Sequence, residues 1–179
     1  ETYENARKVL NMAREAIPTD PLIWITAAKL EEACHPDPTT VVERIIEKAI
    51  ASLGQNQVVI EREKWLKDAE AAEHSGAPLV CGAIVRQTIK LGVDDEDRML
   101  TWLDDADMCL SRPTGPSVVT ARAVYAYALT QFPKKTEVWL KNKRGCVRMS
   151  LYDVYEGYLD NRLRMTWFER DGILISFEN

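Results

Sequence analysis

Apolar side chains recur every three to four residues along most of this chain, which is the spacing of one face of a helix. Val42, Ile45, Ile46 and Ala49 are an example. Before the last nine residues, no segment alternates apolar and polar positions as a half-buried strand does. The pattern and its breaks predict helices at about 1–16, 21–34, 38–53, 61–75, 78–91, 95–110 and 116–131, and from about 135 onward.

Proline marks several of the predicted boundaries. Asp20 and Asp37 each precede a proline, and this pair is typical of a helix start, where the aspartate caps free amides and the proline loses no hydrogen bond. Pro18 and Pro133 each follow the end of a predicted helix. These signals predict short connections between consecutive helices.

Four tryptophans reveal an internal repeat. They are separated by 41, 37 and 37 residues, which is the length of a helix–turn–helix unit. In the first three units an alanine follows four residues later, on the same helical face, where it leaves room for a neighbouring helix. We call the tryptophan-bearing helix of each unit helix A. Its repeat positions are Trp24, Ala28, Trp65, Ala69, Trp102, Ala106 and Trp139.

A second pattern alternates with the first and defines helix B of each unit. Seven positions between Ala6 and Trp24 match positions between Ala121 and Trp139 in residue type at a constant offset of 115. Its small residues are Ala6, Ala13, Ala121 and Ala128. Helix pairs that bury their apolar faces only against their neighbours stack into a solenoid. We therefore predict an all-α fold of antiparallel helix-pair repeats stacked as an α-solenoid.

The repeat divides the chain into two parts. We expect a repeat array at residues 1–141 that starts in helix B of one unit. Lys143 then stands where the next alanine is due, so residues 142–179 form a divergent segment, interpreted as a capping helix and a tail. Glu1 is not an initiator methionine, and we expect the chain to be a piece of a longer protein. Val9, Leu10 and Ile17 would then lack a covering helix, which favours self-association at this N-terminal end.

Composition narrows the class of partner. The 179 residues are 46% hydrophobic and 28% charged, as in globular proteins, and the formal net charge is −5. This charge disfavours general binding to a phosphate backbone. No apolar run approaches the roughly 20 residues that span a bilayer, so we expect no membrane partner. A protein partner is favoured, and RNA contact is a minor possibility for the basic and aromatic stretch 134–170.

Candidate chemistry is sparse, and we expect no catalytic, cofactor-binding or metal-binding residues. The four cysteines lie far apart and are interpreted as reduced core residues rather than zinc ligands. His35 and His74 each follow a helix A and lack a catalytic partner. The carboxylates of 94–97 and 104–107 could suggest a metal site, but the spacing of a calcium loop is missing. We expect the first cluster at a helix start and the second facing solvent.

The repeat resembles the HAT (half-a-tetratricopeptide) family. Residues 4–32, 97–107 and 121–129 are similar, in content and order, to the HAT array of the pre-mRNA processing factor 6 family of spliceosomal proteins. The resemblance covers residues 1–141. It implies a nuclear, non-enzymatic protein–protein scaffold in pre-mRNA splicing, part of a tri-snRNP bridging factor with spliceosomal snRNP proteins as partners.

Two alternatives remain open from the residues alone. One is a HAT scaffold of another RNA-processing complex, such as 3′-end cleavage or ribosome assembly. The other is a helical enzyme that uses a metal bound at 94–107.

Overall fold

The computed structural model describes residues 2–113, 115–136 and 138. Within these residues the chain forms seven α-helices and no strand, and the predicted all-α fold is confirmed. The helices are α1 (Thr2–Ala16), α2 (Pro21–Cys34), α3 (Pro38–Gln55), α4 (Arg62–His74), α5 (Pro78–Thr88), α6 (Arg98–Leu110) and α7 (Val118–Gln131). Trp139, most of the helix expected from about 135 and the whole segment 142–179 lie outside the described residues.

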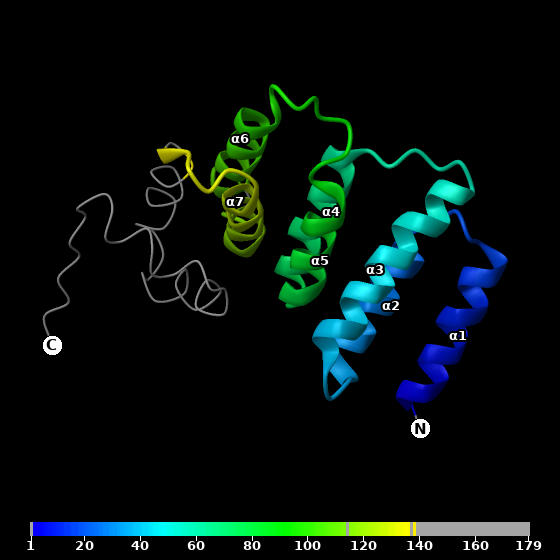
Figure 1. Cartoon of the computed structure of the whole chain (residues 1–179). Coiled ribbons are helices and arrows are strands. Elements are labelled where there is room, and N and C mark those ends of the chain that lie inside the picture. The colour runs from blue at the N-terminus through cyan, green and yellow to red at the C-terminus, as the bar shows by residue number, and fades with distance from the viewer. Residues whose placement is uncertain (1, 114, 137, 139–179) are drawn as a thin grey trace, which may run out of the picture.

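The helices pack as consecutive pairs. α2 pairs with α3, α4 with α5, and α6 with α7, while α1 packs on α2. Successive pairs are joined mainly through their B helices, because α5 lies against both α3 and α7. In Figure 1 the pairs follow one another in chain order, from α1 in blue to α7 in yellow-green. This one-dimensional stacking is an α-solenoid, as predicted.

Most helix boundaries agree with the sequence pattern, with two differences. α5 ends at Thr88 rather than 91, and α6 begins at Arg98 rather than 95 because 94–97 form a turn. Asp20 caps α2 by accepting a hydrogen bond of 2.9 Å from the amide of Leu22. Asp37 occupies the corresponding position before α3 but makes no side-chain capping bond.

The tryptophan and alanine repeat positions of α2, α4, α6 and α7 line one continuous core along the stack. Trp24 retains 8% of its exposed surface, Trp65 3% and Trp102 1%. The alanines of the repeat that are buried are Ala28, Ala69, Ala106, Ala121 and Ala128. Large and small side chains on adjacent turns thus pack together between neighbouring helices.

Helix α1 differs from the other six helices because it contains no buried residue. Ala6 and Ala13 are only half-buried, since α2 covers one side of α1. Val9 and Met12 keep 64% and 68% of their surface exposed, and Ile17, just beyond the helix, keeps 52%. Leu10 is half-buried and therefore does not belong to this exposed apolar face. None of the helices described here is both long and apolar enough to cross a lipid bilayer.

Candidate interaction surfaces

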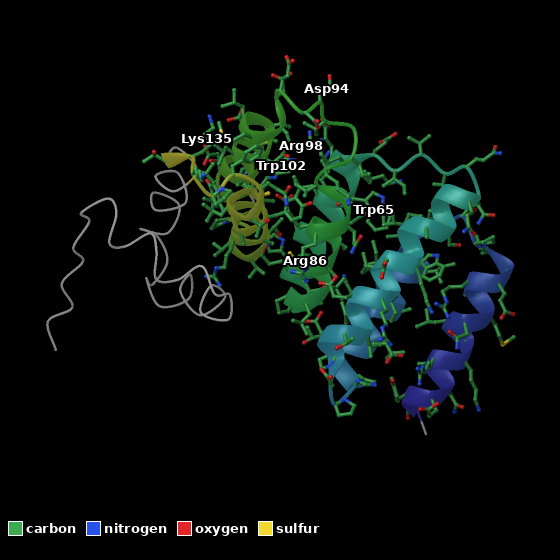
Figure 2. The ribbon with its side chains drawn as sticks, in the orientation of Figure 1. Trp65, Arg86, Asp94, Arg98, Trp102 and Lys135 are labelled. Carbon is green, nitrogen blue, oxygen red and sulfur yellow. The ribbon has the colours of Figure 1, made fainter. Side chains whose placement is uncertain are left out.

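Trp102 joins two successive repeats. Its indole nitrogen donates a hydrogen bond of 2.8 Å to the carbonyl of Ile89, which follows α5. Its ring meets the ring of Tyr127 edge-on at 5.2 Å between centroids and lies 5.9 Å from that of Phe132. Figure 2 shows Trp102 on α6 and Trp65 on α4. The side chain therefore contacts the preceding repeat as well as helix B of its own.

Trp24 occupies the equivalent position in the first pair but has different surroundings. The guanidinium group of Arg14 lies over its ring, with the central carbon 4.7 Å from the ring centroid. The indole nitrogen of Trp24 is buried without a hydrogen-bond partner in the described part of the chain. An unmet buried donor costs stability, so the first pair is held less firmly here than the third.

Two glutamates form a repeated contact between successive repeats. Glu32, in the last turn of α2, accepts hydrogen bonds of 2.9 and 2.8 Å from the amides of Leu79 and Val80 at the start of α5. Ala77 at the N-cap of α5 has no side-chain oxygen that could accept from these amides, so the carboxylate of Glu32 takes that role. The carboxylate also lies at the positive end of the α5 dipole.

Glu73 makes the same contact one repeat later. It accepts hydrogen bonds of 2.8 and 2.9 Å from the amides of Val119 and Thr120, and one of 2.7 Å from the Thr120 hydroxyl. Glu32 and Glu73 both lie eight residues after the tryptophan of their helix A. The sequence analysis missed this pair, although that shared spacing was visible. In the third unit the equivalent position is Leu110.

The acidic residues predicted to face solvent at 104–107 do not all do so. Asp105 is 3% exposed and forms an ion pair with Arg62 of α4. The prediction was wrong for Asp105 because this side chain is buried within the stack, where Arg62 of α4 contacts it. Burial raises the pKa of Asp105 to about 6, and the positive charge of Arg62 opposes the shift. Asp107 accepts a hydrogen bond from the hydroxyl of Tyr125.

The first acidic cluster lies just before α6. Asp94, Asp95, Glu96 and Asp97 are exposed, and Asp95 pairs with Arg98 in the first turn of the helix. Across residues 2–113, 115–136 and 138, no three histidine, cysteine or acidic side chains converge in a way that could hold a metal ion. The contacts described for Asp95, Asp105 and Asp107 are ion pairs and hydrogen bonds.

The cysteines and histidines take varied positions. Cys81 and Cys109 are buried, and burial raises the pKa of Cys81 to about 12 and that of Cys109 well above its usual range. Cys34 is exposed, so the interpretation of all four cysteines as core residues was wrong for this one. It is the last residue of α2. His35 caps α2, and His74 ends α4.

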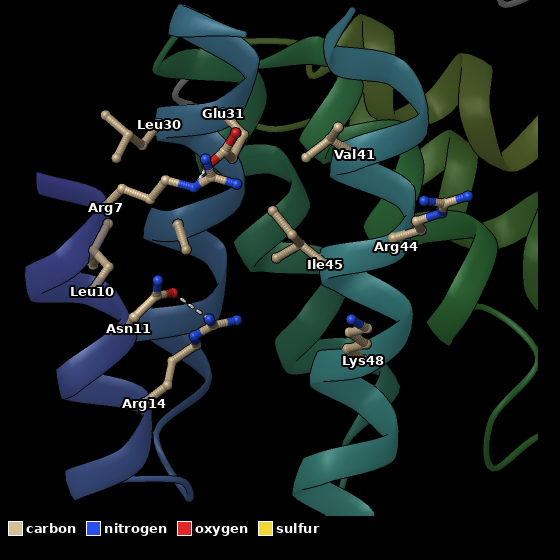
Figure 3. A pocket seen from close by; sticks show the side chains of 11 residues that line it. Arg7, Leu10, Asn11, Arg14, Leu30, Glu31, Val41, Arg44, Ile45 and Lys48 are labelled. Atoms are coloured by element: carbon tan, nitrogen blue, oxygen red, sulfur yellow. Dashed lines mark hydrogen bonds and ion pairs between the residues drawn. The ribbon is translucent and has the colours of Figure 1, made fainter. Parts of the chain in front are cut away.

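A groove of about 300 Å³ lies between α1 and α3, with α2 as its floor. We call it the α1–α3 groove (Figure 3). Its lining carries four basic residues and one acidic residue. The lining residues are Arg7, Leu10, Asn11, Arg14, Ala27, Leu30, Glu31, Val41, Arg44, Ile45 and Lys48. Sequence analysis missed this surface and placed the basic stretch at 134–170, which lies almost wholly outside the described residues.

Stacked antiparallel helix pairs with a repeating Trp–Ala core place the chain in the class of helix-pair α-solenoids. No family model matches the chain. It is similar to human pre-mRNA-processing factor 6, with 54% identity over 103 residues. These residues are 58% of this chain and 11% of the human protein. The resemblance expected from the sequence is confirmed.

Similarity extends to more distant organisms. Pre-mRNA-splicing factor prp1 of Schizosaccharomyces pombe is 40% identical over 100 residues, or 56% of this chain and 11% of that protein. Protein STABILIZED1 of Arabidopsis thaliana is 49% identical over 73 residues, or 41% of this chain and 7% of that protein. The chain thus spans about a tenth of the length of the curated relatives it matches.

Proposed function

We propose that this chain is a non-catalytic interaction scaffold in pre-mRNA splicing and forms part of a nuclear factor that bridges components of the tri-snRNP. The observation that carries this proposal is the 54% identity to pre-mRNA-processing factor 6 over 103 residues. The proposed partners are spliceosomal snRNP proteins.

The fold supports a scaffolding role. A solenoid presents an extended surface whose shape is set by packing between repeats, and such surfaces hold partners in fixed positions. Trp102, Glu32 and Glu73 each form hydrogen bonds that join successive repeats. The outward positions are then free to carry partner-specific side chains.

Capture from nuclear extract tests the proposal. The full chain is immobilised, incubated with extract and washed, and bound proteins are quantified by mass spectrometry. A Trp65→Ala/Trp102→Ala double variant, in which two buried rings are removed, controls for binding that does not need the fold. We expect snRNP proteins to be enriched by the wild-type chain alone, and the enrichment to survive ribonuclease treatment because the contacts are with protein.

Two results would contradict the proposal. Enrichment of 3′-end cleavage or ribosome-assembly proteins in place of snRNP proteins would assign the scaffold to another complex. Magnesium-dependent hydrolysis of a phosphoester by the purified chain, removed by Asp94→Asn or Asp104→Asn, would show an enzyme.

A further inference from the structure

The α1–α3 groove combines apolar walls with a charged rim. Leu10 of α1, Leu30 of α2 and Ile45 of α3 contribute apolar surface from all three helices that form it. In Figure 3 Ile45 points toward the space between α1 and α3, while Arg44 and Lys48 lie on the α3 side. Its volume of about 300 Å³ is at the lower end of the range for ligand sites in proteins.

The charges of the groove are unbalanced. Its single acidic residue, Glu31, is already engaged by Arg7 at 3.1 Å and by the hydroxyl of Tyr3 at 2.8 Å. Arg44 and Lys48 are exposed, and neither has an acidic partner among the described residues. Together with Arg14 they leave three uncompensated positive charges at one site of a chain whose formal net charge is −5.

Arg14 is held in place with part of its hydrogen-bonding capacity unused. Its guanidinium group stacks on Trp24 and donates to the amide oxygen of Asn11. Its Nε atom is buried and has no hydrogen-bond partner in the described part of the chain, while the rest of the side chain is half-buried. A fixed guanidinium loses little conformational entropy when it binds a carboxylate, so it is suited to bind one.

We call the place where two successive B helices face each other a joint of the stack. At the next joint, basic side chains are paired with acidic ones. Across the joint between α3 and α5, Arg86 forms an ion pair with Glu43. Across the α1–α3 groove, Arg14 stands on one side and Arg44 and Lys48 on the other, and none of these three forms an ion pair within the described part of the chain. The groove is therefore complementary to a negatively charged group supplied from outside these helices.

We propose that the α1–α3 groove binds an acidic segment of a partner protein, in which carboxylates meet Arg14, Arg44 and Lys48 while apolar side chains contact Leu10, Leu30 and Ile45. This inference deepens the proposed scaffold function, since it names the chemistry of one partner. RNA is a poorer occupant because the groove lining contains no aromatic ring for base stacking.

Fluorescence anisotropy with three labelled probes tests the proposal on the full chain. The probes are a peptide in which Asp residues are interspersed with Leu, the same peptide with Asn in place of Asp, and an oligouridine of equal length. The test variant is Arg44→Glu/Lys48→Glu. The matched control is Lys67→Glu/Lys90→Glu, which makes the same change of charge at exposed positions outside the groove. Circular dichroism checks that all three proteins are equally helical.

We expect the acidic peptide to bind more tightly than the Asn peptide, and salt to weaken that difference. The groove variant should lose about tenfold in affinity for the acidic peptide, while the control loses less than about threefold. An equal loss of affinity in both variants would show that the effect comes from the overall charge of the chain and not from the groove, and would overturn the proposal. So would the absence of acidic-peptide binding, or oligouridine binding that only the groove variant loses. These outcomes leave the capture of snRNP proteins by the wild-type chain unaffected, so the two proposals can fail separately.

Discussion

The joint between α1 and α3 and the joints further along the stack are built differently. α3 lies against α5, and α5 lies against α7, so each of these B helices covers its neighbour. Between α1 and α3 there is a groove, and α1 contains no buried residue. The closed joints also carry a carboxylate from the preceding helix A, Glu32 at α5 and Glu73 at α7.

The comparison separates what builds the solenoid from what it can present to a partner. In a closed joint the apolar and charged side chains of the two helices contact each other, as the ion pair between Arg86 and Glu43 illustrates. The open joint keeps similar side chains accessible, including Arg44 and Lys48 on α3. The same repeat geometry thus yields packing in one place and a binding groove in another.

The largest expected effect lies in the third pair. Trp102→Ala removes a fully buried ring and its hydrogen bond to Ile89, and should lower the free energy of unfolding by about 3–5 kcal/mol. Trp24→Ala should cost less, by about 1 kcal/mol or more, because the indole nitrogen of Trp24 has no partner to lose. Urea unfolding followed by circular dichroism measures both variants. An equal loss of unfolding free energy in both variants would contradict the difference expected between the two ends of the stack.

The carboxylate contacts come next. Glu73→Gln should lower the free energy of unfolding by about 1–3 kcal/mol, because an amide replaces one of the two acceptors that meet three donors. Glu32→Gln should have the same sign and a somewhat smaller size, since only two amides are involved. Glu43→Gln is the matched control, as its pair with Arg86 is partly exposed and worth less than about 1 kcal/mol. A cost for Glu43→Gln equal to that of Glu73→Gln would contradict the account.

The pH dependence of stability tests the surroundings of Asp105, which is buried and contacts Arg62 of α4. Because burial raises the pKa of Asp105 to about 6, the folded state holds a proton that the unfolded state releases at lower pH. This carboxyl therefore favours folding at about pH 4, and the contribution is lost as the pH rises through 6. Asp105→Asn should flatten the decline in unfolding free energy between about pH 4 and 7. A decline that is the same in both proteins would show that Asp105 titrates normally.

The smallest effect on stability is expected at the outer face of α1. Val9→Ser/Met12→Ser should change the free energy of unfolding by less than about 0.5 kcal/mol, since both side chains are exposed. The same variant tests the predicted self-association, because this face is the apolar surface that would mediate it. Sedimentation velocity should show dimers in the wild-type chain and monomers in the variant. Monomers of both proteins at high concentration would remove the self-association prediction.

Much of the fold follows from the sequence because its determinants are local. The Trp–Ala spacing and the prolines after Asp20 and Asp37 set the helix faces and starts, and the helix boundaries differ by only a few residues. The exposure of Asp105 could not be predicted in this way. Its surroundings depend on tertiary packing, including a contact with Arg62, which lies 43 positions away in the sequence.

The interaction surfaces were harder to predict for the same reason. The groove brings together Arg14 and Arg44, which no short motif connects, and it exists only because α1 lies away from α3. The Glu32 and Glu73 contacts span 47 and 46 residues to Leu79 and Val119. Their shared position after the tryptophan was the one signal in the sequence that could have found them.

Hydrogen–deuterium exchange, resolved to single helices, tests the contrast between open and closed joints most directly. Amides of α5 and α7, which are packed on several sides and capped by carboxylates, should exchange most slowly. Amides of α1 should exchange fastest among the seven described helices, because α1 contains no buried residue and contacts mainly α2. Adding the acidic peptide should slow exchange in α1 and α3 more than in α5 and α7. Protection of α1 equal to that of α5 in the free chain would contradict the account.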